Sequence, residues 1–350
     1  MPHVTCSPIM IIGTERSGSN LLRLVLNSHS RIAIPHPPHF MRYLAPIAAS
    51  YGDLAEEGNR RALVRDALKL LHAHIHPWEH EISEERVVVE AQPSLFGVVA
   101  AIYDQYRRAE AKARWGCKST FMVDHVAEVL SLYPAAQFIW LVRDPRDVAS
   151  SAKRSVFGPC HPYLTARLWV SQQARGLAAL DAHGPDVIHL LRYEDLVSSP
   201  ERSVAQVSDF LGERLEPTML EHHRSDAARR TASLCESWRN TDQPITTRQV
   251  GRYQVGLSTV ERLQVEQQAG HLMARFGYVV DEPFRQTALP SLVAVRSRDL
   301  LLRARVEVQS MQSDRNHRRR WLRYWTVEWL RIKGRVRLVA KRATRSPGGD

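Results

Sequence analysis

The sequence has few cysteines and no long apolar run. Its 350 residues contain four cysteines, scattered without paired spacing at positions 6, 117, 160 and 235. This composition excludes a disulfide-rich secreted domain and favours a reduced, cytoplasmic setting. No stretch of about 18 apolar residues occurs, so we predict no transmembrane helix. Because no basic segment precedes the first apolar run, we expect that run to be a core strand and not a signal peptide.

The basic excess of the chain is confined to one end. The whole sequence has 48 Lys+Arg and 37 Asp+Glu, and residues 291–350 hold 16 of the former and 5 of the latter. The first 290 residues therefore have 32 of each sign, and their charge gives no support to nucleic-acid binding. With 44% hydrophobic residues overall, the chain can bury one large α/β core.

The first chemically informative segment is residues 13–20. It follows the apolar residues 9–12 and leads into a helix-forming stretch, which predicts a strand, a tight loop and a helix. Such a loop directs backbone N–H groups and the positive end of the helix dipole at one point, where phosphate or sulfonate oxygens bind. The glycine spacing matches the start of the nucleotide-triphosphate loop, but Ser19 and Asn20 replace its Lys-Ser/Thr pair. Arg16 is the only cation inside the loop.

A second anion-binding segment begins after residues 137–142, which have the composition of a buried strand. The next residues, 143–147, read as a turn with proline at an acceptable first helical position. Ser151 lies eight residues after Arg143, about two turns into the following helix. In this arrangement Arg143 can bind a phosphate through two N–H groups while Ser151 donates its hydroxyl.

In these two segments the chain resembles the sulfotransferases that use 3′-phosphoadenosine-5′-phosphosulfate (PAPS). In that family the first loop holds the 5′-phosphosulfate, and an arginine with a serine eight residues later holds the 3′-phosphate. The resemblance implies the same roles here. The donor-binding residues that it implies are Arg16, Ser17, Gly18, Ser19, Asn20, Arg143 and Ser151.

Further segments extend the resemblance to about residues 8–279. Lys118 matches the lysine that neutralises the bridging oxygen of the leaving group, and its distance of 25 residues to Arg143 is similar to that in the tyrosylprotein branch. The late strand and helix of the family are matched around Tyr193, and the loop that closes over the 3′-phosphate is matched at residues 246–253. These two segments add Tyr193, Thr247, Arg248, Gly251 and Arg252 to the implied donor site.

The resemblance implies an enzyme that moves a sulfuryl group from PAPS to a hydroxyl of an acceptor. Arg16, Lys118 and the loop N–H groups would hold the sulfonate and stabilise the departing phosphate oxygen, with no metal required. The sequence does not identify the acceptor, which in this family can be a carbohydrate, a lipid or a small natural product. Three other functions stay open: a small-molecule kinase using ATP and Mg²⁺, a non-catalytic donor-binding or membrane-adaptor protein, and an acidic-lipid binding protein.

The general base is where the sequence departs from the family. Many relatives have a glutamate 21 residues after the basic residue of the loop, and this position is Pro37 here. His36 and His39 flank it, and a neutral imidazole with a pKa near 6.5 accepts a proton at physiological pH. We predict a histidine base, with a slight preference for His36. The alternative is that both histidines only pack in a proline-rich turn, while Glu90 or the donor itself takes the proton.

Four histidines at positions 72, 74, 76 and 80 could gather metal ligands on one face of an extended segment. No cysteine or second cluster completes such a site, and the implied chemistry needs no bound metal. We therefore expect no metal, and a polar segment that lines the acceptor cleft.

Alternating strand and helix patterns predict an α/β fold with a mainly parallel sheet flanked by helices. We expect a sulfotransferase domain over residues 1–290, with a mostly helical insertion at 40–85 that has a polar break at 56–61, and a basic helical extension over 291–350. The expected strands after the first are 86–90, 113–116, 137–142 and 186–191, and the expected helices are 95–111, 121–132, 144–155 and 163–183.

Residues 315–345 form a predicted amphipathic helix. Trp321, Trp325 and Trp329 recur at four-residue intervals, Ile332 continues the stripe, and arginines and lysines surround it. This pattern favours docking against the parent domain or a second subunit, with binding to an anionic membrane surface as the alternative. We therefore expect a cytoplasmic protein, peripheral to the membrane in the second case.

Overall fold

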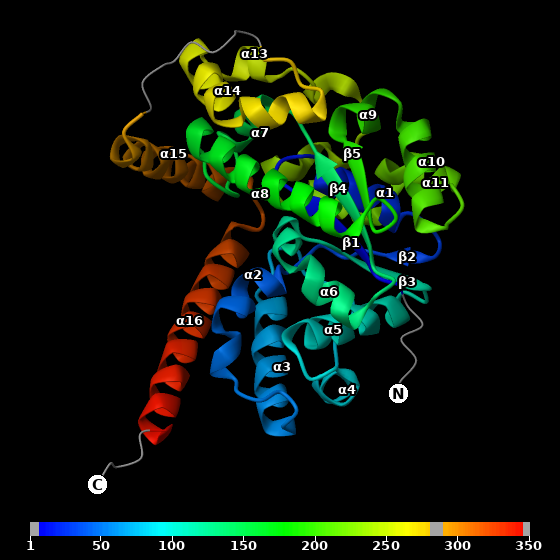
Figure 1. Ribbon diagram of the computed structural model, residues 1–350, viewed down its shortest axis with the longest axis vertical. Coiled ribbons are helices and arrows are strands. Elements are labelled where there is room, and N and C mark those ends of the chain that lie inside the picture. The colour runs from blue at the N-terminus through cyan, green and yellow to red at the C-terminus, as the bar shows by residue number, and fades with distance from the viewer. Residues whose placement is uncertain (1–6, 281–289, 346–350) are drawn as a thin grey trace.

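The computed structural model describes residues 7–280 and 290–345, with side chains as far as residue 340. Its centre is a five-stranded parallel sheet in the order β2-β3-β1-β4-β5 (Figure 1). The predicted α/β class with a parallel sheet is confirmed. The strands are β1 (Ile9–Gly13), β2 (Ile32–Ala33), β3 (Arg114–Lys118), β4 (Gln137–Val142) and β5 (Ile188–Arg192).

Helices cover both faces of this sheet (Figure 1). The α-helices are α1 (Ser19–Asn27), α2 (Phe40–Leu44), α3 (Glu57–His72), α4 (Glu84–Glu90), α5 (Leu95–Ala109), α6 (Val126–Leu132), α7 (Pro145–Ala152), α8 (Pro162–His183), α9 (Tyr193–Ser198), α10 (Pro200–Leu211), α11 (Pro217–Leu220), α12 (Asp226–Ala232), α13 (Tyr253–Gly256), α14 (Thr259–Met273), α15 (Leu292–Ser313) and α16 (His317–Arg345). The 3-10 helices are η1 (Ala45–Ser50), η2 (Thr120–His125), η3 (His222–Arg224), η4 (Glu236–Asp242), η5 (Thr247–Gln249) and η6 (Ala274–Phe276).

Strand β1 is apolar on both sides because it is buried between two helical layers. Ile9 and Ile11 belong to the core formed with α1, α10 and α11. Met10 and Ile12 point to the opposite face, as alternate residues of a strand do, and belong to the core formed with α3, α5 and α8. Because the strands are parallel, their carboxyl ends lie at one edge of the sheet, where ligands bind in such folds.

The strand expected at 86–90 is wrong, because this segment is helix α4. Three consecutive valines suggested a strand, yet the Ser83 hydroxyl caps the helix by accepting a hydrogen bond from the Arg86 N–H. Two glutamates in the first turn add a favourable interaction with the helix dipole. Val87 and Val88 are buried while Val89 is 82% exposed, so the valine run crosses from the inner to the outer side of one helix.

The polar break expected at 56–61 is also wrong, because α3 begins at Glu57 and continues through it. Glu57 lies in the first turn and forms an ion pair with Arg61 one turn later, at 2.8 Å. An acidic residue at the start of a helix and an i,i+4 pair of this orientation both favour helix. The polar run is therefore the exposed beginning of a helix.

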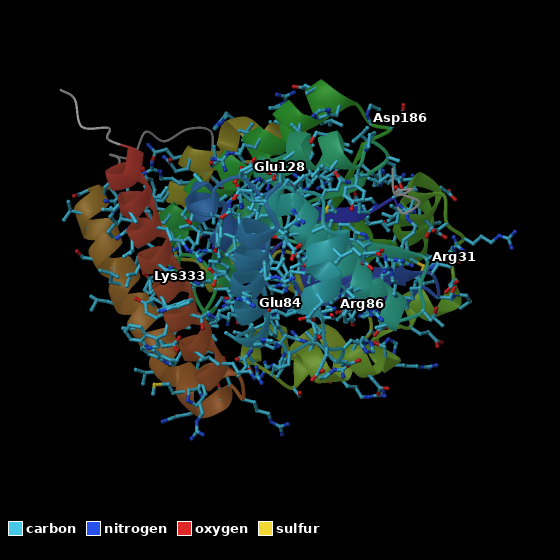
Figure 2. The ribbon with its side chains drawn as sticks, turned by 90° about the horizontal axis from the view of Figure 1, so that it is seen from below. Arg31, Glu84, Arg86, Glu128, Asp186 and Lys333 are labelled. Carbon is cyan, nitrogen blue, oxygen red and sulfur yellow. The ribbon has the colours of Figure 1, made fainter. Side chains whose placement is uncertain are left out.

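Helix α16 docks on the domain along α3 and η1 (Figure 1). Val327 and Leu330 are buried in the main core, and Lys333 reaches the buried carboxylate of Asp66 at 2.7 Å. Figure 2 shows Lys333 at the boundary between this helix and the body of the molecule. Gly334 lies inside the helix, and a Cβ at this position would meet Ile47 at 2.9 Å. The glycine therefore permits close approach of the helix.

Three of the four cysteines lie among the described residues. Cys117, Cys160 and Cys235 are buried and free, and Cys6 lies outside the described residues. Within 7–280 and 290–345, no helix has the length and apolar character needed to cross a membrane.

Candidate active site

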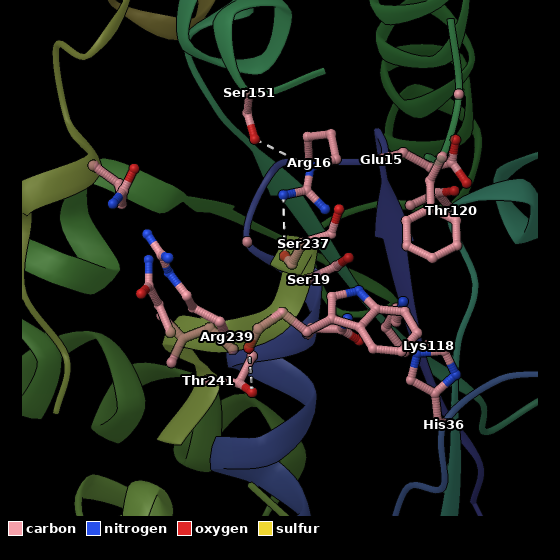
Figure 3. Close-up of a pocket in the computed structure, with 18 of the residues that line it drawn as sticks. Glu15, Arg16, Ser19, His36, Lys118, Thr120, Ser151, Ser237, Arg239 and Thr241 are labelled. Carbon is pink, nitrogen blue, oxygen red and sulfur yellow. Dashed lines mark hydrogen bonds between the residues drawn. The ribbon is translucent and has the colours of Figure 1, made fainter. Parts of the chain in front are cut away.

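A cavity of about 730 Å³ opens at the carboxyl edge of the sheet. Its walls come from the segments that follow β1, β2, β3, β4 and β5, together with η4 and residues of α15 and α16. Figure 3 shows Lys118 and His36 on one side of this cavity, and Ser151 and Arg239 on the other. The sequence-predicted site residues that line it are Arg16, Gly18, Ser19, Asn20, His36, His39, Lys118, Arg143, Ser151, Tyr193 and Arg248.

The loop after β1 holds a backbone conformation that few residues adopt. Gly13 has φ 143° and Gly18 has φ 89°. A Cβ at Gly13 would meet the Leu141 carbonyl oxygen at 2.2 Å, and one at Gly18 would meet the Tyr193 ring at 2.4 Å. Helix α1 begins directly after Gly18 without a side-chain cap, so its first backbone N–H groups are available to an anion.

Two predicted site residues share an unusual left-handed backbone. Arg16 has φ 72° and His39 has φ 60°, and in the described part of the chain Ala111 is the only other residue besides glycine with positive φ. Strain of this kind persists only where surrounding contacts hold it, and it occurs often at functional sites. Both side chains border the cavity.

The two anion-binding segments meet in space, although 127 residues separate Arg16 from Arg143. The Arg16 guanidinium donates to the Ser151 hydroxyl at 3.1 Å. Arg143 donates to the Arg16 carbonyl oxygen at 3.0 Å and lies over the Tyr193 ring, 4.3 Å from its centre. The phosphate loop and the arginine–serine pair therefore form one continuous surface.

Buried contacts from α8 and α9 fix these segments from behind. The Trp169 indole donates to the Arg143 carbonyl oxygen at 3.0 Å, and Gln173 donates to the Thr14 hydroxyl at 2.8 Å. Glu194 accepts from the Asp144 backbone N–H at 3.0 Å. The site is thus held by side chains that do not themselves face the cavity.

Lys118 ends β3 beside the phosphate loop, and its ammonium group is buried. Burial, and then the nearby positive charge of Arg23, lower the pKa of Lys118 to about 7. Buried ammonium groups lose their proton more easily because the charged form loses hydration. An anion bound beside Lys118 would restore the charged form.

His36 and His39 both border the cavity near Lys118. The Nδ1 of His36 lies 3.0 Å from the His74 Nε2, and the His36 Nε2 has no hydrogen-bond partner in the described structure. The Nδ1 of His39 lies 2.9 Å from the Ser119 hydroxyl. Burial, together with neighbouring His76 for His36 and Lys118 for His39, lowers the pKa of both imidazoles well below 6.5. Both rings are therefore neutral at physiological pH.

The cavity carries a strong positive charge. Among the described residues that line it, eight are lysine or arginine and one, Glu15, is acidic. This excess favours an anionic ligand with more than one charged group. The basic lining residues are Arg16, Arg42, Lys118, Arg143, Arg239, Arg248, Arg303 and Arg323.

Four of the predicted donor residues do not line the cavity. Ser17 is fully buried beneath the loop. The Gly251 N–H donates to the Asp147 carboxylate at 2.8 Å, which directs this part of the closing loop toward α7. Thr247 and Arg252 are exposed outside the cavity, where Thr246 and Gln249 line it instead.

Glu90, the carboxylate considered as an alternative base, is also outside the cavity. It ends α4 and forms an ion pair with Arg108 at 2.8 Å. Because the expected strand at this position is a helix, its end does not reach the ligand edge of the sheet. Glu15 is the carboxylate that does line the cavity, next to Arg16 in the phosphate loop.

Several residues that line the cavity were not predicted from the sequence. Glu15 stands inside the motif itself and could have been found there. Trp238 in η4 carries no motif, yet it stacks on Phe157 and lies 4.6 Å from the His36 ring. Arg303 and Arg323 come from the C-terminal extension, where no local signal indicates contact with the cavity.

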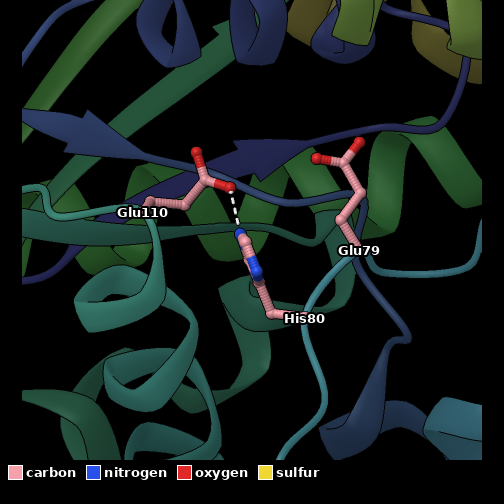
Figure 4. A group of neighbouring side chains, drawn as sticks. All are labelled: Glu79, His80 and Glu110. Carbon is pink, nitrogen blue, oxygen red and sulfur yellow. Dashed lines mark hydrogen bonds and ion pairs between the residues drawn. The ribbon is translucent and has the colours of Figure 1, made fainter.

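The four clustered histidines do not converge on a metal. His74 and His76 are buried beside His36, whereas His80 lies beside Glu110 and is accompanied by Glu79 (Figure 4). In the described residues, Glu79, His80 and Glu110 form the one group with metal-like ligand spacing. Glu79 is already paired with Arg230, and His80 with Glu110 at 2.6 Å. None of the three borders the cavity.

Comparisons with known proteins agree with this geometry. A sequence model described as the sulfotransferase family matches residues 8–217, and the chain therefore belongs to the sulfotransferase family. An uncharacterized protein of Aquifex aeolicus (strain VF5) is 24% identical over 264 residues, which cover 70% of this chain and 32% of that protein. The chain thus spans about a third of the length of this curated relative.

Two solved structures share the fold. The sulfotransferase domain from the curacin biosynthetic pathway has a TM-score of 0.51 and 20% identity, over 79% of this chain and 99% of that one. The sulfotransferase domain from the Synechococcus PCC 7002 olefin synthase has a TM-score of 0.52 and 22% identity, over 79% of this chain and 97% of that one. At these identities the likeness establishes the sulfotransferase fold, and the details of this site rest on its own residues.

Proposed function

We propose that this protein transfers a sulfuryl group from PAPS to a hydroxyl-bearing acceptor. The observation that carries the proposal is the junction of two anion-binding segments, in which Arg16 bonds Ser151 and Arg143 bonds the Arg16 backbone. A donor with two separate anionic groups, at its 5′ and 3′ positions, matches two linked anion sites better than a simple phosphate does. The uncapped N-terminus of α1 would bind the phosphosulfate, and Arg143 with Ser151 would bind the 3′-phosphate.

Catalysis would consist of positioning and charge stabilisation. Arg16, Lys118 and the N–H groups of the loop would hold the sulfonate and stabilise the negative charge that develops on the departing phosphate oxygen. The acceptor hydroxyl would attack in line from the side of His36 and His39, and one of these imidazoles would accept its proton. The products are a sulfate ester and 3′-phosphoadenosine-5′-phosphate (PAP).

A phosphoryl-transfer function is the competing proposal. It would need a lysine for the γ-phosphate and a hydroxyl ligand for Mg²⁺ after Gly18, and Ser19 and Asn20 occupy those positions. Lys118 comes from a different strand. The residues present fit a metal-independent anionic donor.

Donor binding gives a direct test. PAP is expected to raise the melting temperature strongly, and ATP with Mg²⁺ less, because charge-assisted hydrogen bonds to the 3′-phosphate contribute roughly 1.5–3 kcal/mol each. Arg143→Ala should remove the preference for PAP over adenosine-5′-phosphate, whereas Arg202→Ala, at an exposed position of α10, should keep it. Melting without ligand controls for damage to the fold. Equal stabilisation by ATP that disappears on chelation of Mg²⁺ would favour the kinase.

A further inference from the structure

The C-terminal extension contributes to the cavity wall. Arg303 of α15 and Arg323 of α16 both line the cavity, although they lie beyond residues 8–217, which the family model matches. Arg303 already donates to the Gly158 carbonyl oxygen at 3.0 Å and pairs with Asp299 at 3.4 Å. Arg323 is different, since it forms no hydrogen bond or ion pair within the described residues.

Arg323 has more basic than acidic side chains around it. Arg323 is half-buried, and its guanidinium carbon lies 5.8 Å from the centre of the Tyr43 ring. Its basic neighbour Arg42 pairs with Glu15 at 3.7 Å and stacks over Phe121 at 4.0 Å. Glu15 is thus one carboxylate beside two guanidinium groups. A guanidinium that lines a cavity and has no protein acceptor can form charge-assisted hydrogen bonds to an added anion.

The positive charge of Arg323 lies on the side of the cavity that His39 lines. Arg42 stacks over Phe121, whose ring centre lies 5.5 Å from that of His39. Burial lowers the pKa of His39 and His74, and the nearby positive charge of Arg323 also lowers the pKa of both. Arg42 meets the phosphate loop at Glu15, whereas Arg143 is bonded to the Arg16 and Gln249 carbonyl oxygens on the far side of Arg16 from Glu15 in the sequence. The donor groups therefore have their own cations, and the charge of Arg323 is available to the acceptor.

We propose that the acceptor carries an anionic group, a carboxylate, phosphate or sulfate, which binds Arg323 and Arg42 while its hydroxyl reaches the histidines. This inference rests on the proposed function and narrows its substrate class. It assigns the C-terminal extension a role in acceptor selection. A hydroxyl compound without an anionic group would leave Arg323 without a partner.

Matched acceptor pairs test this inference by binding, without turnover. The protein saturated with PAP is titrated with 4-hydroxyphenylacetate against its methyl ester, and with glycerol 3-phosphate against glycerol. The anionic member of at least one pair should bind about 10-fold more tightly or better, since a charge-assisted contact is worth this much. Arg323→Gln should abolish the difference, Arg323→Lys should retain part of it, and Arg318→Gln, exposed on the same helix, should leave it unchanged.

The outcomes distinguish failure of the proposed sulfuryl transfer from failure of the anionic-acceptor inference. Failure of PAP to bind the wild-type protein contradicts the proposed function. Binding of PAP with no anion preference in either pair, or with a preference that Arg323→Gln does not reduce, overturns the anionic-acceptor inference alone. Melting temperatures of all variants identify any that lose α16 packing, and Arg42→Gln then supplies an independent variant in the same subsite.

The outer face of α16 carries a second, independent feature. Trp321, Trp325 and Trp329 are 45%, 62% and 45% exposed, whereas Val327 and Leu330 are buried on the docking side. Trp329 lies at the edge of that contact, where the Lys69 ammonium of α3 is 4.5 Å from its ring centre. The expected amphipathic helix is therefore present, but its aromatic stripe faces outward. Further exposed apolar residues along this outer face are Leu322, Tyr324, Ile332, Val336 and Val339.

We propose that this outer face lies on an anionic lipid bilayer. Tryptophan beside arginine is the combination that suits a membrane interface, where the ring enters the headgroup region and the cation attracts the lipid phosphate. Arg318, Arg331 and Arg335 are exposed around the stripe, and the whole basic excess of the chain lies in residues 291–350. The cations flanking the stripe match an anionic surface better than they match a second copy of the same basic helix.

Vesicle sedimentation with the 350-residue chain tests the membrane proposal, since removal of residues 291–350 would also remove part of the cavity wall. Binding to phosphatidylglycerol-containing vesicles should exceed binding to phosphatidylcholine vesicles by about 10-fold or more, and should weaken in high salt. The triple variant Trp321→Ser, Trp325→Ser and Trp329→Ser should lose this binding but keep PAP binding. Val255→Ser, an exposed apolar position on α13, is the control.

Light scattering of the same samples tests the alternative, in which a second copy of the chain covers the tryptophan stripe. If the wild-type protein is a dimer that the triple variant dissociates, and neither binds vesicles, the stripe is an interface between two copies and the membrane proposal is wrong. Unchanged vesicle binding by the triple variant also overturns it.

Discussion

His36→Ala is expected to lower the turnover of sulfuryl transfer about 10²–10⁴-fold, while the affinity for PAP stays within a few-fold. The His36 Nδ1 faces His74 at 3.0 Å, and its Nε2 has no partner in the described structure. When Nδ1 carries the hydrogen and donates it to His74, Nε2 presents a lone pair. Burial keeps this imidazole neutral before the reaction, so its lone pair is available to accept the proton of the acceptor hydroxyl.

Single-turnover measurements on PAPS-loaded protein separate this effect from binding. His39→Ala is the direct comparison, because His39 also borders the cavity but its Nδ1 is bonded to Ser119. His72→Ala is the control from the same histidine-rich region, where the side chain is exposed outside the cavity. Near-normal turnover in His36→Ala, His39→Ala and the double variant would exclude a histidine base. Glu15→Gln would then be the informative substitution.

The parts of the site that the sequence could predict are those set by local structure. A strand, a glycine-bounded loop and a helix produce the anion site from adjacent residues, and the Arg143–Ser151 pair depends only on one helix start. Parallel strands then bring both segments to the same edge. The spacing of the motifs does not predict which side chains contact one another. In the structure Arg16 bonds Ser151, and no spacing rule predicts this contact.

The parts that could not be predicted depend on tertiary contacts. The valines of α4 resemble a strand until Ser83 and two glutamates are seen as a helix start. The closing loop was matched by sequence, yet Asp147 directs Gly251 away from the cavity. Arg323 joins the site only because α16 packs through Val327 and Leu330 and thereby leaves its tryptophans exposed. Amphipathicity alone does not tell which face of a helix docks when both faces carry apolar residues.

Lys118→Met is expected to lower turnover about 10²–10³-fold and to remove a pH dependence of donor binding. The pKa of Lys118 is about 7 in the unliganded protein because burial, and then Arg23, disfavour its charged form. An anionic donor binds the charged form, so its affinity is fully present below pH 7 and declines as the pH rises through 7. Linkage of this kind predicts a decrease in PAP affinity of roughly 10-fold between pH 7 and pH 8.5.

Titration calorimetry of PAP binding across this range isolates Lys118 from its neighbours. His36 and His39 have pKa values well below 6.5, and burial raises the pKa of adjacent Cys117 to about 11, so none of them changes charge between pH 7 and 8.5. The second pKa of a phosphate monoester is near 6, so the phosphates of PAP are mostly in the doubly ionised form at pH 7 and change little above it. Lys118→Met should bind PAP more weakly at pH 7 with a flat profile, and Lys153→Met, which removes an ion pair with Glu261 outside the cavity, should keep the wild-type slope. A slope that persists in Lys118→Met would show that another group binds the proton, and near-normal turnover of this variant would show that Lys118 does not neutralise the leaving group.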